Sequence, residues 1–131
     1  MKILPAATPL SQPYWDAARA HRLVFQRCRA CANVWHPPMP ICPACHAADF
    51  DWQPAAGGGS VYTYTIVHHP THPAFQDRVP YIVAVVELDE GPRIVINIKD
   101  CSIAEVCGGM RVSIVFEDVT EAVTLPQARP A

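Results

Sequence analysis

Two closely spaced pairs of cysteines constrain this chain more than any other feature. Cys28 and Cys31 form one C-x-x-C pair, Cys42 and Cys45 form a second, and ten residues separate the two pairs. Each pair can present two thiolates from one tight turn, and two such turns complete the tetrahedron that Zn²⁺ accepts from four sulfurs. The sequence therefore predicts a structural zinc site with four ligands: Cys28, Cys31, Cys42 and Cys45.

Other interpretations of the cysteines stay open from the spacing alone. Iron in a rubredoxin-like site is one, because four thiolates do not by themselves choose the metal. A redox dithiol and cysteines buried without a ligand are the others. If the four thiolates bind a metal, no ligand position is left for water, so the metal would be structural rather than catalytic. We predict that the remaining cysteines, Cys101 and Cys107, are thiols of the core.

The composition is that of a small folded protein. Half of the 131 residues are hydrophobic and 17% are charged, which excludes a disordered chain. Fourteen prolines fix φ and remove amide donors, so long helices are disfavoured. The first ten residues match neither a signal peptide nor a membrane anchor. We therefore predict a cytoplasmic protein with no membrane partner, whose cysteines bind metal rather than form disulfides.

The chain divides at Gly57–Gly59, which we interpret as a flexible joint. Before it, Ser11 can cap a short helix over residues 12–20, and residues 23–26 are typical of a strand leading into the first cysteine. The expected units are an N-terminal helical segment, a zinc ribbon and a β domain, over residues 1–22, 23–54 and 55–131.

The second half of the chain is dominated by β-branched and aromatic residues in five strand-like runs. Between the third and fourth runs, Ser102 and Glu105 have the spacing of a capping box and Gly108-Gly109 follows, which predicts a short helix. Three strands, a helix and two strands is the order of the five-stranded OB barrel, with a small β-sandwich as the alternative. The runs are Val61–Val67, Tyr81–Leu88, Arg93–Ile98, Arg111–Glu117 and Ala122–Leu125.

No motif in the sequence carries catalysis. There is no phosphate-binding glycine loop between a strand and a helix, and no nucleophile stands in a recognisable pattern. His68, His69 and His72 suggest a second metal cluster, and a surface loop with histidines is the alternative. Pro70 and Pro73 leave the ligand geometry unconstrained, which favours the loop.

The charge argues against nucleic acid as a partner. The formal net charge is −2, and residues 55–131 contain nine acidic and five basic side chains. Binding to a phosphate backbone needs the opposite balance. OB barrels and zinc ribbons both occur in proteins that bind single-stranded nucleic acid. Binding of single-stranded nucleic acid therefore stays open as an alternative function.

Several segments of this chain occur together in one known family. They are the two C-x-x-C pairs, Pro37-Pro38, Gly59–Tyr62, Pro80–Leu88 and Gly109–Val112. In this combination the chain resembles the DUF35 family of acyl-CoA-associated proteins over about residues 12–126. The resemblance implies a mainly β fold with an N-terminal helix, a rubredoxin-like zinc ribbon and a C-terminal five-stranded OB-fold barrel. It also implies a noncatalytic accessory subunit of a thiolase-like or acyltransferase enzyme that acts on acyl-CoA thioesters.

The chain departs from the family where glycine is usual in loops. Ala32 and His46 follow the second cysteine of each pair, and we expect a positive φ and local strain there. His21, before the first strand, and Lys99-Asp100, after the third strand of the barrel, are the other departures.

The accessory role gives two further hypotheses. Acyl-CoA would contact the chain at the junction of ribbon and barrel, where Arg27, Arg29 and Arg78 are candidate cations for its phosphates. The alternative is that these arginines are solvated or structural. Trp35–Pro40 and His68–Phe75, both stiffened by proline, are candidate docking segments for the partner enzyme, unless they pack inside the chain.

Overall fold

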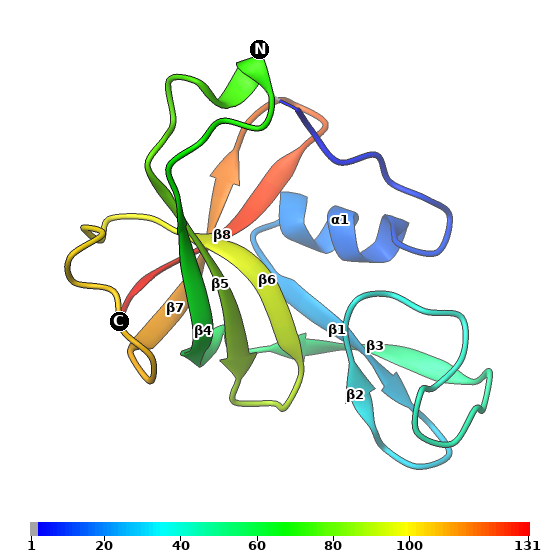
Figure 1. Ribbon diagram of the computed structural model, residues 1–131. Coiled ribbons are helices and arrows are strands. Elements are labelled where there is room, and N and C mark those ends of the chain that lie inside the picture. Colours follow the sequence, from blue (N-terminus) through cyan, green and yellow to red (C-terminus); the bar gives the residue numbers. More distant parts are fainter. Residues whose placement is uncertain (1–2) are drawn as a thin grey trace.

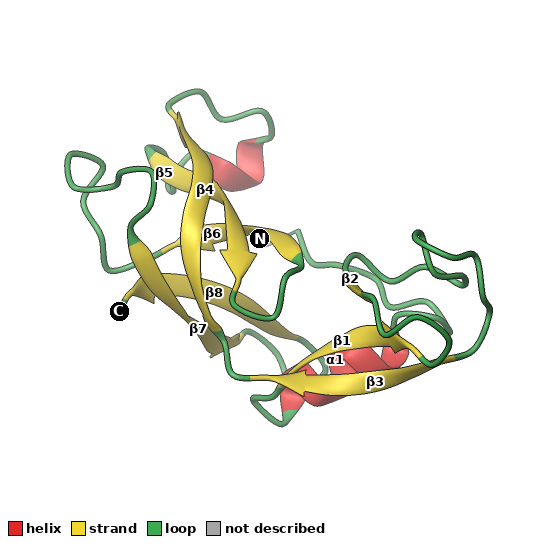
Figure 2. Ribbon diagram, turned by 90° about the horizontal axis from the view of Figure 1, so that it is seen from below, coloured by secondary structure: helices red, strands yellow, loops and turns green. Residues whose placement is uncertain are grey.

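The computed structural model describes residues 3–131, which form a helix, a three-stranded sheet and a closed five-stranded barrel (Figure 1). Figure 2 shows the helix lying against the sheet, with the barrel beside them. This architecture confirms the predicted mainly β fold. No helix within the described residues is long and apolar enough to cross a membrane. The elements are α1 (Gln12–Arg19), β1 (Leu23–Cys28), β2 (Val34–Trp35), β3 (Phe50–Ala55), β4 (Gly58–Val67), the 3-10 turn η1 (Pro73–Phe75), β5 (Tyr81–Leu88), β6 (Arg93–Ile98), β7 (Arg111–Asp118) and β8 (Thr124–Pro130).

The three-stranded sheet is centred on β1, which pairs antiparallel with β2 on one side and β3 on the other. Gln26 is buried in β1, and its side chain binds the backbone of Met39 twice. Nε2 donates to the carbonyl oxygen and Oε1 accepts from the N–H group, both at 2.8 Å. These bonds satisfy a buried amide and attach the proline-rich segment to the sheet. The sequence does not predict β3, because a proline at position 54 argues against a strand.

The barrel closes in the order β4-β5-β6-β8-β7, with β4 paired to β5 on one edge and to β7 on the other. Every second residue of β5 and β6 is buried inside, which is the period of a strand with one face on a core. The closed barrel confirms the OB-like prediction over the sandwich. The last strand begins later than predicted, at Thr124, because the Thr120 hydroxyl accepts from the N–H groups of Ala122 and Val123 and holds them in a turn.

The predicted helix between β6 and β7 is wrong. Ser102–Glu105 forms a turn, in which the Glu105 N–H donates to the Ser102 carbonyl at 3.0 Å. The next residue, Val106, is buried in the barrel core, so the chain enters the core before a second helical turn can form. α1 forms as predicted, but the Ser11 hydroxyl does not cap it. That oxygen accepts instead from the N–H of Thr8 at 2.9 Å.

The glycine triplet belongs to the barrel and is not a flexible joint. Gly58 and Gly59 begin β4, and Gly59 pairs with Leu88 of β5 and with Val112 of β7. A Cβ atom on Gly59 would lie 2.7 Å from the Glu87 carbonyl oxygen and 2.8 Å from Val86 Cγ1. The barrel can therefore close here only around a residue without a side chain.

Gly59→Ala is expected to lower the free energy of unfolding by about 2–3 kcal/mol, because the backbone oxygen of β5 cannot yield without moving the strand. Gly108→Ala is the matched control, since a Cβ atom there meets nothing within 4 Å. Urea unfolding followed by tryptophan fluorescence measures both. Equal stability of the two variants would contradict the role of Gly59.

His21 couples the helix and ribbon to the barrel. It lies between α1 and β1 with φ 57°, and its Nε2 is 2.9 Å from Oδ1 of Asp118 at the end of β7. Its ring stacks on Phe116 with the centroids 5.4 Å apart, and the Thr124 hydroxyl donates to the same carboxylate oxygen at 2.7 Å. The contact with His21 is the main reason that the pKa of Asp118 lies below its usual value. Partners from the barrel thus hold a left-handed residue that is not glycine.

Candidate metal centre

Four cysteine sulfurs meet at the tip of the ribbon, all within 4.8 Å of one another. The closest approaches join the two pairs: Cys28 Sγ lies 3.5 Å from Cys45 Sγ, and Cys31 Sγ lies 3.6 Å from Cys42 Sγ. In a tetrahedral site with Zn–S bonds of about 2.3 Å, the sulfurs lie about 3.8 Å apart. The cluster therefore has the donor set and the spacing that zinc requires.

The first cysteine of each pair is buried and accepts hydrogen bonds from the backbone. Cys28 Sγ accepts from the N–H groups of Ala30 and Cys31 at 3.3 and 3.4 Å, and Cys42 Sγ accepts the two corresponding bonds at 3.4 and 3.5 Å. The Cys31 donor is the main cause that lowers the pKa of Cys28. Burial raises the pKa of Cys42, but the donors outweigh it and bring the value to about 6. These bonds favour the thiolate form of Cys28 and Cys42, which is the form that binds metal.

Ala32 and His46 have left-handed backbones, with φ 66° and 67°, which confirms the prediction from their departure from glycine. The Ala32 N–H donates to the Cys28 carbonyl at 3.0 Å, and the His46 N–H donates to the Cys42 carbonyl at 2.9 Å. These bonds reverse the chain directly after the second cysteine of each pair. Each of the two left-handed residues costs about 1 kcal/mol relative to glycine, because its Cβ atom crowds the following carbonyl oxygen.

The core around the sulfurs is small. Trp35 packs edge to face on Phe50, with centroids 5.8 Å apart, and the two cover the buried Cys28 and Cys42. So few buried side chains cannot fold a segment of this length by themselves. Metal binding would supply the missing stability, as it does in other small zinc domains.

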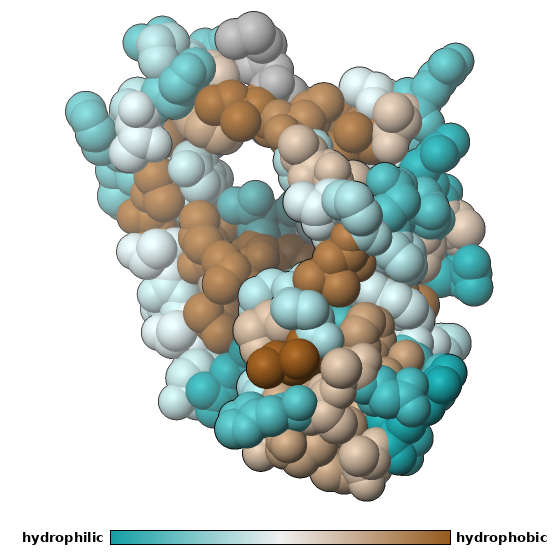
Figure 3. All heavy atoms as spheres, turned by 90° about the vertical axis from the view of Figure 1, so that its right-hand side faces the viewer, coloured by the Kyte–Doolittle hydropathy of each residue, from teal (hydrophilic) through white to brown (hydrophobic). Residues whose placement is uncertain are grey.

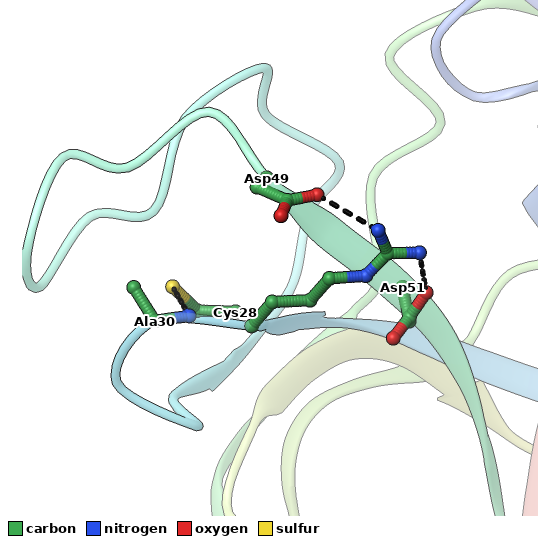
Figure 4. A network of polar contacts seen from close by, with 5 residues as sticks. Cys28, Ala30, Asp49 and Asp51 are labelled. Carbon is green, nitrogen blue, oxygen red and sulfur yellow. Dashed lines mark hydrogen bonds and ion pairs between the residues drawn. The ribbon is translucent and has the colours of Figure 1, made fainter.

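Arg29 has a structural environment. Its guanidinium donates to Asp49 Oδ1 at 3.0 Å and also to Asp51 Oδ1, so that the first cysteine turn is tied to the start of β3 (Figure 4). The hydrogen bond from Arg29 is the main reason that the pKa of Asp51 is lowered. Arg27, two residues earlier on β1, is exposed.

Arg78 lies elsewhere, between η1 and β5. It lines a cavity of about 420 Å³ together with Phe75, Tyr81 and Lys99, while Glu117 offsets part of the positive charge. Arg27 and Arg29 do not line this cavity, and Figure 1 shows the ribbon tip and η1 at opposite ends of the molecule. The structure therefore does not bring the three predicted arginines to one place.

The other sequence candidates do not form a second metal centre. The four-cysteine cluster is the one group of metal-ligating side chains that converges within residues 3–131. In the histidine loop, His72 Nδ1 accepts from the Ala74 N–H at 3.0 Å, so this ring caps η1. Cys101 packs partly against the core, whereas Cys107 is exposed, so the prediction of a core thiol is wrong for Cys107.

The cluster and the barrel match known sequences. Residues 15–51 match the family model described as "ChsH2, rubredoxin-like zinc ribbon domain", and residues 52–117 match "ChsH2, C-terminal OB-fold domain". A solved chain described as "Ltp2-ChsH2(DUF35) aldolase" is 44% identical with a TM-score of 0.86, over 96% of this chain and 98% of that one. The fold and the site thus define a zinc-ribbon protein with an OB barrel. The chain belongs to the DUF35 family.

Two further relatives differ in length. A DUF35 domain-containing scaffold protein of Methanocaldococcus jannaschii is 39% identical over 100 residues, which are 76% of this chain and 70% of that protein. A probable enoyl-CoA hydratase alpha subunit of Thermomonospora curvata is 46% identical over 118 residues, which are 90% of this chain. The present chain spans only 36% of that subunit.

Purified protein is expected to contain close to one zinc ion per chain, and Cys42→Ser is expected to lose most of it because a buried ligand is removed. The same change should destabilise residues 23–52, measured as faster amide exchange. Cys107→Ser is the matched control, because that thiol is exposed and outside the cluster. Full zinc content in Cys42→Ser would refute the site, and elemental analysis measures it. Iron in place of zinc would appear in the same analysis.

Proposed function

We propose that this chain is a noncatalytic accessory subunit of a hetero-oligomeric enzyme that acts on acyl-CoA thioesters. A thiolase-like partner would supply the catalytic groups, and this chain would stabilise it. The observation that carries the proposal is the 44% identity, over nearly the whole of both chains, with the DUF35 chain described as part of an Ltp2-ChsH2 aldolase.

The chemistry of the site supports an accessory role. Four thiolates fill every position of a tetrahedral zinc, so no water can be activated there. His21 and Asp118 are paired, and Thr124 supplies a hydroxyl beside them. That hydroxyl donates to the carboxylate rather than to the imidazole, so no base activates it as in a nucleophilic triad.

Coexpression with the thiolase-like subunit of the same organism is expected to give one hetero-oligomer on size-exclusion chromatography. The partner alone should lose activity or stability, and adding this chain should restore it. The zinc-deficient Cys42→Ser variant tests whether an intact ribbon is needed. Separate elution at micromolar concentrations, together with full carbon–carbon cleavage or acyl-transfer activity of the partner alone, would refute the proposal.

A hydratase subunit is the second candidate for the partner. It is favoured by the 46% identity with the hydratase alpha subunit of Thermomonospora curvata. Hydration of an enoyl-CoA, assayed with each coexpressed complex, distinguishes this candidate from the aldolase or thiolase type.

The nucleic-acid alternative has less physical support. The net charge of −2 opposes binding to phosphate backbones. Tyr62 on the barrel is exposed, as a stacking platform would be, but the Arg93 guanidinium lies 3.8 Å from its ring centroid and covers it. A filter-binding assay with single-stranded DNA at physiological salt tests this alternative directly.

The proposal includes a direct contact with acyl-CoA. Of the three arginines suggested by the sequence, Arg78 has the best environment, because Lys99 adds a second cation and Phe75 and Tyr81 add aromatic surface to the same cavity. Phosphates of CoA suit paired cations, and an adenine ring suits aromatic faces. Arg29 is neutralised by two carboxylates, which makes it a poor phosphate donor.

Arg78→Ala is expected to weaken binding of a medium-chain acyl-CoA to the complex by about tenfold to a hundredfold, since one charge-assisted contact is worth about 1.5–3 kcal/mol. Arg27→Ala and Arg29→Ala, on the ribbon, should change the affinity by less than about twofold. Isothermal titration calorimetry measures all three. Unchanged affinity in Arg78→Ala would remove this cavity from the proposal, and a loss in the ribbon variants would move the contact there.

A further inference from the structure

The strand β6 has one partner along its whole length and almost none on its other side. It pairs with β5 from Arg93 to Ile98, but its pairing with β8 is confined to the single bridge between Ile98 and Ala128. In the part of the chain that the structure describes, the barrel is thus closed at one end of this seam only. The remaining edge of β6 is open.

The hydrogen-bond phase of the β5–β6 hairpin shows which groups face this open edge. Leu88 donates to the Pro92 carbonyl at 2.9 Å, so these two residues form a hydrogen-bonded pair. In an antiparallel ladder such pairs alternate with pairs whose N–H and C=O groups point outward. Val95, opposite Val85, therefore directs both of its backbone groups away from β5. The bond from the Lys99 N–H to the Ala128 carbonyl, at 2.8 Å, agrees with this phase.

A groove of about 360 Å³ runs along the open edge, between the barrel, α1 and the ribbon. Its floor includes Val95, whose side chain is 71% exposed. Figure 3, which looks onto the side where α1 and the ribbon stand, shows a hollow bordered by hydrophobic residues. The groove walls are Trp15 of α1, Pro37 and Pro38 of the ribbon, and Leu125 and Pro126 of β8.

The groove carries no charge. None of its lining residues is Asp, Glu, Lys or Arg, and the histidine among them, His36, is neutral because burial lowers its pKa to about 4. His36 packs on Tyr14 and Phe25. Of the docking segment that the sequence suggested, Trp35 is buried in the ribbon, whereas the half-buried His36 and Pro37-Pro38 line the groove.

We propose that an extended, uncharged segment of the partner subunit pairs with β6 in this groove and adds a strand to the barrel. An open strand edge binds extended peptides through main-chain hydrogen bonds, and apolar walls take the alternate side chains. Phosphate groups do not suit the site, because no cation lines it. A second copy of this chain does not fit either, since its own β6 edge lies between the same walls. The inference rests on the proposed accessory function and names the contact through which it operates.

Amide hydrogen exchange of the complex, quenched and measured residue by residue, tests the pairing. In the free chain the Val95 amide should exchange quickly, while those of Ile94 and Ile96, which face β5, should be slow. In the complex the Val95 amide should slow by at least about tenfold, as expected for a new ladder bond. A complex that forms without protecting Val95 overturns this inference and leaves the accessory function standing.

Val95→Lys supplies the matching affinity test. Its side chain is exposed, so the free chain should keep its stability and zinc, while burying the charge under the partner should weaken binding by about tenfold or more. Val95→Thr keeps the shape and should bind within about threefold of the native chain. Ile103→Lys places the same charge on the exposed β6–β7 loop and should have no effect. Unchanged binding of Val95→Lys overturns the inference, as does protection of Val95 that rises with chain concentration when the partner is absent.

Discussion

The convergence of four cysteine sulfurs is the constraint on which the ribbon depends. Only Cys28, Trp35 and Cys42 form its buried cluster, so the segment between β1 and β3 has little hydrophobic stabilisation of its own. The metal that these sulfurs are suited to bind would fix both cysteine turns. The position of the segment Pro37–Pro40 depends on the same sheet. Gln26 binds the backbone of Met39, and this contact keeps Pro37 and Pro38 at the groove beside the barrel.

Patterns of local chemistry predicted most of the fold. The spacing of the cysteines predicted the cluster, and runs of β-branched and aromatic residues predicted the barrel strands, although the last strand extends to Pro130 instead of ending at Leu125. The family's usual glycines predicted left-handed backbones at Ala32 and His46, and two further positions that depart from those glycines, His21 and Asp100, are left-handed as well. Backbone geometry at these turns is set by the fold, and this sequence keeps it with larger side chains. The capping box failed because burial of Val106 outweighed a local helix signal.

What the sequence could not provide depends on register and on contacts between distant segments. Arg29 looked like a phosphate donor until the pairing of β1 with β3 placed Asp49 and Asp51 beside it. The sequence also showed no sign of the open edge of β6, because this edge depends on where along the chain β8 pairs with β6. A strand pattern shows which side chains are buried and says nothing about which backbone groups find a neighbour.

The double pairing of Gly59 bears on the order in which the chain can fold during its synthesis. The strand pairs of the ribbon and its four cysteines lie within residues 23–55, so they can come together as soon as that segment has left the ribosome. β4 can pair with β5 next. The second partner of Gly59, which is Val112 of β7, is synthesised about fifty residues after Gly59 itself. Until then β4 presents an unpaired edge to other nascent chains. The interval between the synthesis of β4 and that of β7 is thus when this protein is most exposed to wrong pairing.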